Sequence, residues 1–84
     1  MYHIPVIDMV RTGANIARIR TAAGVSVRQL QAVLGFATPQ AIYKWQQGRA
    51  LPTLDNLVIF AEVCRVRLDD ILVYQDDKQH TMTA

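Results

Sequence analysis

Signals that end and restart a helix recur at short intervals along the first two thirds of this chain, and they leave no room for a long element between them. Gly24, Gly35 and Gly48 each suit the position after a helix, because glycine adopts the left-handed backbone conformation without steric cost. A start signal follows each glycine, in which a hydroxyl side chain caps the first amides of the next helix. The start signals are the Ser26/Gln29 capping box, Thr38-Pro39 and Pro52-Thr53. The chain is therefore predicted to be a succession of short helices.

Apolar residues recur at helical spacing between these signals, which gives each helix an inner face. The helices are expected from Asp8 or Thr12 to Gly24, between Ser26 and Gly35, over 39–47, after Thr53, and from a cap at Asp69. Five short helices on short turns predict an all-α, compact bundle. Three parts are expected, namely an extended N-terminal arm (1–11), the helical domain (12–74) and a mobile polar tail (75–84).

The composition is that of a small folded binding module. With 84 residues the chain has room for one core, and its 51% apolar and 19% charged residues exclude a disordered tail. The single cysteine, Cys64, excludes an internal disulfide framework and a multi-cysteine zinc site. The longest apolar run, Leu57 to Ala61, is far shorter than the roughly 20 residues that span a bilayer, and we read no signal peptide. We therefore expect a cytoplasmic protein without a membrane partner.

The charge is divided unevenly along the sequence. Residues 1–53 carry six basic side chains and one acidic side chain, a net charge of +5, whereas residues 54–84 carry three basic and six acidic side chains, a net charge of −3. A basic half joined to an acidic half favours a polyanion such as nucleic acid as the partner. The alternative is an ordinary solvated surface on which charges cluster by chance.

Residues 26–47 have the pattern of two short helices joined by a glycine turn, an arrangement that reads DNA when the second helix faces outward. The major groove is about 12 Å wide and admits one α-helix. Gln40 suits adenine and Lys44 suits guanine, and their spacing of four residues puts them on one helix face. Ala41 or the methyl group of Thr38 suits a thymine methyl. The alternative is that these polar side chains form an ordinary solvated face.

From residue 13 to residue 73 the chain resembles the Cro/C1-type (XRE-like) helix–turn–helix family of bacterial and phage regulators. The resemblance is carried by the order of six segments, which are 15–20, 24–31, 34–36, 38–49, 51–57 and 66–72. It implies a lambda-repressor-like five-helix fold in which the third helix is the recognition helix. The base-contacting residues that it implies are Thr38, Pro39, Gln40, Tyr43 and Lys44. The backbone-contacting residues that it implies are Val27, Arg28, Gln47 and Arg49.

The chain departs from this family at Gln46, where many members have a glutamate that pairs with an arginine of the first helix. The corresponding arginine here is Arg20. A hydrogen bond to a neutral amide is weaker than a charge-assisted one, so Arg20 either bonds Gln46 or turns to a phosphate. We count Arg20 among the expected DNA backbone contacts.

The remaining candidate residues predict no catalytic or metal site. His3 and His80 lie near opposite ends of the chain and have no companion cysteines. Cys64 falls on an apolar helix face, where a buried thiol acts as a small hydrophobic side chain. The paired acids are Asp69-Asp70, which suit a helix start, and Asp76-Asp77, which lie in the tail. We expect a protein that is not an enzyme and binds no metal, cofactor or small-molecule ligand.

These features predict a sequence-specific regulator that binds double-stranded DNA, namely a nucleoid-associated repressor that reads a palindromic operator as a homodimer. The apolar residues expected to join the two copies are Ile59, Val63, Val66, Val73 and Tyr74. The arm contributes a strand with the apolar residues Tyr2, Ile4, Val6 and Ile7. The alternative is a protein-interaction module, an antitoxin-like partner or the target of an anti-repressor, in which DNA binding is secondary. In that case the apolar fourth helix and the arm dock a different protein.

Overall fold

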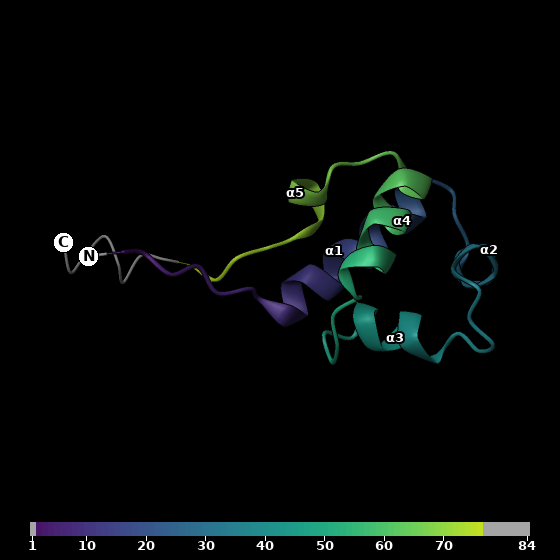
Figure 1. Ribbon diagram of the computed structural model, residues 1–84, viewed down its shortest axis with the longest axis horizontal. Coiled ribbons are helices and arrows are strands. Elements are labelled where there is room, and N and C mark those ends of the chain that lie inside the picture. The colour runs from purple at the N-terminus through teal and green to yellow at the C-terminus, as the bar shows by residue number, and fades with distance from the viewer. Residues whose placement is uncertain (1, 77–84) are drawn as a thin grey trace.

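The computed structural model describes residues 2–76, and within them it has five helices in the predicted order (Figure 1). The helices are α1 (Met9–Ala22), α2 (Val27–Leu34), α3 (Gln40–Gln46), α4 (Leu54–Cys64) and α5 (Leu68–Ile71). The predicted all-α bundle is confirmed. No helix within 2–76 has the length and apolar character that a bilayer crossing requires. The predicted tail beyond residue 76, with His80, lies outside the described residues.

Two of the predicted start signals and one predicted stop signal are in place. The hydroxyl of Ser26 accepts from the backbone N–H of Gln29 at 3.0 Å, and the Gln29 side chain accepts from the Ser26 N–H at 2.8 Å, which completes the predicted capping box. Thr53 caps α4 by accepting from the N–H of Asn56 at 3.3 Å. Gly35 closes α2 with a φ of 73°, a conformation in the left-handed region that favours glycine.

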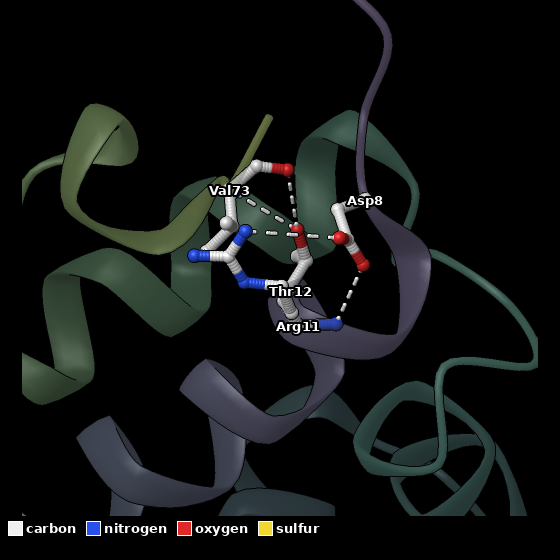
Figure 2. Close-up of polar contacts among 4 residues, drawn as sticks. All are labelled: Asp8, Arg11, Thr12 and Val73. Atoms are coloured by element: carbon white, nitrogen blue, oxygen red, sulfur yellow. Dashed lines mark hydrogen bonds and ion pairs between the residues drawn. The ribbon is translucent and has the colours of Figure 1, made fainter. Parts of the chain in front are cut away.

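Helix α1 begins earlier than the predicted boundary between arm and domain. The carboxylate of Asp8 accepts from the N–H of Arg11 at 2.9 Å, so 9–11, which were expected in the arm, are helical (Figure 2). Thr12, the other candidate cap, is fully buried and bonds a distant segment instead.

Two predicted caps differ from those in the structure. Helix α3 begins at Gln40 with Pro39 at the N-cap, while the Thr38 hydroxyl accepts from the Gln40 N–H at a long 3.4 Å. Helix α5 begins after Arg67, whose N–H donates to the Asp70 carboxylate at 2.9 Å. Asp69 therefore lies inside α5, because the reciprocal carboxylate three residues beyond the cap fixes the helix start.

The core fills the space that the helices enclose. Its buried residues come from every helix and are Ile16, Ile19, Leu30, Ile42, Trp45, Leu57, Phe60, Ala61, Cys64 and Ile71. The rings of Trp45 and Phe36 meet edge to face with centroids 5.8 Å apart, which ties α3 to the turn that precedes it.

Helices α1 and α3 approach each other closely at two glycines. A Cβ on Gly13 would lie 2.8 Å from the Gly48 nitrogen and 2.9 Å from the Gln46 oxygen, and closer still to the carbonyl oxygen of Trp45. A Cβ on Gly48 would lie 2.6 Å from the Cα of Val10. Helix α3 and its C-terminal turn therefore pack directly against the backbone of α1.

The two ends of the described chain are joined to each other and to α1. The Thr12 hydroxyl donates to the carbonyl of Val73 at 3.2 Å and accepts from its N–H at 2.9 Å (Figure 2). The Asn15 amide donates to the carbonyls of Asp70 and Ile71 at 2.8 and 2.9 Å. Residues that follow α5 are thus held against α1 by polar side chains.

The N-terminal arm pairs with the segment that follows α5. An antiparallel bridge joins Ile7 to Tyr74, and Gln75 donates its N–H to the carbonyl of Val6 at 2.8 Å. Of the apolar arm residues, Ile7 makes an isolated bridge, and its partner lies in the same chain; the contribution of the arm to a contact between copies stays a prediction. Gln75, the first residue of the predicted tail, is thus hydrogen-bonded to the arm, and the tail itself stays a prediction.

Candidate nucleic-acid interface

Helix α3 turns its two faces to different surroundings. Ile42 and Trp45 are buried in the core, with exposed fractions of 0% and 4%. Gln40 and Lys44, one turn apart, are both exposed to solvent. Since the inner face fixes the rotation of the helix, the two polar side chains are held on the outer face together.

A shallow groove runs beside this outer face. It encloses about 460 Å³ between α3 and the turn that precedes it. The residues that line it are Gly35, Phe36, Ala37, Thr38, Gln40, Ala41, Lys44, Trp45 and Ala50. The groove thus brings Thr38, Gln40 and Lys44 together around an apolar floor. Such a surface offers amide and ammonium donors to base edges and an apolar contact to a methyl group.

Pro39 and Tyr43 do not line this groove. Pro39 is half-buried at the start of α3, and Tyr43 is 43% exposed. The expected base contacts thus extend from the turn before α3 to its last turn and do not share a single pocket.

The start of α2 leaves two amides for an external acceptor. The N–H of Gln29 is bonded by Ser26, whereas those of Val27 and Arg28 have no partner among residues 2–76. Val27 packs its side chain on the core, and Arg28 is exposed. Free amides beside a cation at a helix N-terminus are suited to a phosphate.

The half-buried guanidinium of Arg20 bonds two acceptors within the protein. Its Nε donates to the side-chain oxygen of Gln46 at 2.9 Å, and Nη1 donates to the carbonyl of Val25 at 2.8 Å. The guanidinium therefore joins α1 to α3 and to the turn before α2. Of the two alternatives for Arg20, the bond to Gln46 is present, and the DNA backbone contact of this residue stays a prediction.

Gln47 and Arg49 flank the end of α3. Both side chains are exposed, and the Arg49 guanidinium donates to the Gln47 side-chain oxygen at 3.4 Å. The Arg49 N–H also donates to the carbonyl of Lys44 at 2.9 Å, which closes the helix. The backbone of Arg49 is thus joined to α3, and its cation lies just beyond the end of this helix.

The other sequence candidates form no site within residues 2–76. No group of three metal-ligating side chains occurs there. Cys64 is buried, and burial raises the pKa of its thiol while the charge of Arg20 opposes the shift. The thiol is therefore protonated and packs as an apolar group.

The expected dimer patch is only partly exposed. Val63 and Val66 pack against the core, whereas Ile59 and Tyr74 are 36% and 47% exposed. Val73 is half-buried beside Thr12. The dimer patch stays a prediction, with Val63 and Val66 half-buried and less accessible than Ile59 and Tyr74.

Two features were not predicted from the sequence. One is the set of apolar residues that α4 exposes, and the other is the set of hydrogen bonds that Thr12 and Asn15 of α1 make to the segment 70–73. Leu54 is 70% exposed and Val58 is 50% exposed. Thr12 and Asn15 carried no recognisable signal, since each bonds a partner more than 50 residues away along the chain.

Comparisons with known proteins agree with this geometry. The family model described as helix–turn–helix matches residues 16–71. The restriction-modification controller protein C.AhdI from Aeromonas hydrophila is similar in structure, with a TM-score of 0.66 and 22% identity over 76% of this chain and 96% of that one. A hypothetical transcription factor from Neisseria, NHTF, has a TM-score of 0.65 and 16% identity, and the match covers 98% of both chains. No curated protein matches the sequence.

Proposed function

Because this chain belongs to the Cro/C1-type helix–turn–helix family of DNA-binding transcriptional regulators, we propose that it reads a specific palindromic operator as a homodimer and represses transcription. The observation that carries the proposal is the outward pair of Gln40 and Lys44 on a helix whose opposite face is locked in the core. Selection of bound duplexes from a random pool tests it directly. The expected result is a two-part motif with symmetric halves, and recovery of unrelated sequences would contradict it.

The proposed mechanism uses the groove beside α3. Gln40 pairs with adenine through its amide, Lys44 donates to the acceptors of guanine, and Thr38 with Ala41 contacts a thymine methyl. Arg28, with the amides at the start of α2, and Arg49 after α3 hold the flanking phosphates. Helix α3 has seven residues, about 10 Å of helix, and covers only a few base pairs. Two copies related by a twofold axis supply the rest of the specificity.

Replacing Gln40 by alanine is expected to weaken binding to the selected operator by about 1–3 kcal/mol, because a bidentate contact to one base is lost. The loss is confined to one base pair of each half-site. Fluorescence anisotropy with a set of singly substituted duplexes measures it: the variant binds the substituted and original bases equally at that position. Unchanged affinity and unchanged preference would exclude Gln40 as a reading residue.

Replacing Arg28 by alanine is expected to weaken binding to every duplex and to lower the slope of log K against log salt by about one unit per copy, because one phosphate contact is lost. Arg67→Ala is the matched control. It removes the same charge at the start of α5, which lies across the bundle from α3 in Figure 1. Equal salt slopes for the two variants would show that binding depends on the net charge of the protein and not on a phosphate contact made by Arg28.

A protein-interaction module is the second candidate function, and the exposed apolar side chains Leu54 and Val58 on α4 favour it. Purification of the chain from its native host separates the two candidates. A stoichiometric protein partner without enriched DNA supports this second function.

A further inference from the structure

One side chain of α1 bonds both parts of the DNA-reading unit. The Arg20 guanidinium donates from Nε to the side-chain oxygen of Gln46, in the last turn of α3, at 2.9 Å, and from Nη1 to the carbonyl of Val25 at 2.8 Å. Val25 immediately precedes Ser26, the N-cap of α2. Within residues 2–76, no other side chain hydrogen-bonds both α3 and the segment that leads into α2. Arg20 is therefore a polar link between the end of α3 and the start of α2.

Both partners of this guanidinium are neutral. Gln46 offers a carboxamide oxygen and Val25 a peptide carbonyl, and no carboxylate of the described chain forms an ion pair with Arg20. Because arginine keeps its proton at every pH at which proteins are folded, this site carries one full positive charge. The charge is balanced by dipoles and not by an opposite charge.

A carboxylate in place of the Gln46 amide would bond Arg20 more strongly, because a Coulomb attraction would add to the hydrogen bond. Both side chains are half-buried, so water and salt screen the pair less than at an open surface. Glutamate has the length of glutamine, so the same position accommodates either. The chain thus forgoes stability at residue 46 without a gain in packing, which is typical of a position that serves function.

The cation lies close to the part of α2 where the proposed phosphate contacts are made. Nη1 is 2.8 Å from the Val25 oxygen, and the covalent bonds from that oxygen to the Val27 nitrogen span at most about 7 Å, so the cation is at most about 10 Å from the first free amide of α2. Charges interact over about 10 Å in 0.1 M salt. Arg28 follows Val27 and is exposed. A phosphate held by these groups is therefore within reach of the field of Arg20.

On these observations, and resting on the proposed operator-reading function, we propose that Arg20 is a positioning residue whose uncancelled charge attracts the DNA backbone to the start of α2. The charge acts through space, so this role requires no contact of the guanidinium with DNA. Gln46 makes the role possible, because its amide holds the guanidinium in place and leaves its charge uncancelled.

Gln46→Glu tests the proposal, since it keeps the hydrogen bond and cancels the charge. The expected result is a thermal midpoint a few degrees above that of the wild type, together with an affinity for the selected operator lowered at least about threefold in about 0.1 M salt. The difference in affinity becomes smaller as salt is added, because added ions screen the charge of Arg20 in the wild type. Fluorescence anisotropy in a salt series measures the affinity, and circular dichroism measures the midpoint.

Arg20→Met is the second variant, and it removes the same charge without adding a carboxylate. Methionine has an unbranched side chain but donates no hydrogen bond, so the thermal midpoint is expected to fall. The affinity is expected to fall as well, by at least about threefold under the same conditions. The two variants thus change stability in opposite directions and affinity in the same direction. A purely structural role of Arg20 would make affinity follow stability.

Gln75→Glu is the matched control for Gln46→Glu. It makes the same chemical change at an exposed residue of the segment that follows α5, at the end of the molecule away from α2 (Figure 1). Its affinity is expected to stay within about twofold of the wild type, because salt screens a charge at that distance.

Three outcomes overturn the proposal. Gln46→Glu binds the operator as tightly as the wild type, or it loses no more affinity than Gln75→Glu, or folded Arg20→Met binds as tightly as the wild type. If the wild-type chain selects a motif and one of these outcomes occurs, only the role of Arg20 is removed. If the wild-type chain selects no motif, the operator-reading function is removed and the role of Arg20 with it.

Discussion

Replacing Trp45 by alanine is expected to lower the free energy of unfolding by about 3–5 kcal/mol, as large aromatic truncations in cores do. Trp45 is 4% exposed, and its ring contacts Phe36 edge to face at the centre of the α3 packing. A chain of this size has a total stability of roughly 4–12 kcal/mol, so the variant is unfolded or close to it at room temperature. Urea denaturation followed by circular dichroism measures the change.

Tyr43→Ala provides the control for Trp45→Ala. Tyr43 lies two residues away on the same helix and is 43% exposed, so its truncation removes a ring of similar size with less buried area. We expect a loss of about 1 kcal/mol or less. If the two variants lose the same amount of stability, Trp45 does not anchor α3 and the inner face of this helix is wrongly assigned.

Replacing Gly13 by alanine is expected to destabilise the protein, although alanine is the better helix former by about 1 kcal/mol. The added carbon would meet three backbone atoms of α3 and its C-terminal turn at less than 3.0 Å. Backbone atoms cannot rotate away as a side chain does, so the helices must separate, at a cost of about 3 kcal/mol or more. The net loss of unfolding free energy is then at least about 2 kcal/mol.

Gly24→Ala separates lack of space from backbone strain. Gly24 has a φ of 74°, and a Cβ there meets nothing within 4 Å, so its substitution costs only the strain of the left-handed conformation, about 1 kcal/mol. Thermal melts of the two variants rank these effects. A Gly13→Ala protein that is as stable as the wild type would mean that α1 and α3 are not in contact at this point.

The parts of the fold that were predicted from the sequence depend on residues that are close together along the chain. The capping box of Ser26 and Gln29 and the cap at Thr53 join residues three apart, and the αL turn at Gly35 depends on one residue. The hydrogen bonds of Thr12 and Asn15 join residues more than 50 positions apart, and the spacing of apolar residues does not predict such a contact. The sequence therefore predicted the helices well and the attachment of the C-terminal segment not at all.

The candidate site divides in the same way. The outward orientation of Gln40 and Lys44 followed from their spacing of four residues and from the apolar Ile42 and Trp45, which mark the inner face, and the structure has these orientations. The role of Arg20 did not follow, because its two acceptors come from separate parts of the chain, Val25 and Gln46. A long side chain with several reachable acceptors is not assigned by sequence spacing.

Thr12 and Gly13 are consecutive residues of α1, yet they serve opposite tasks. The Thr12 hydroxyl holds the segment at Val73 against α1, and Gly13 lets α3 and its C-terminal turn lie directly on the α1 backbone. Since α1 contacts both, a displacement of this helix at Val73 also displaces the surface on which α3 packs. The segment that follows α5 and helix α3 are therefore mechanically coupled through α1.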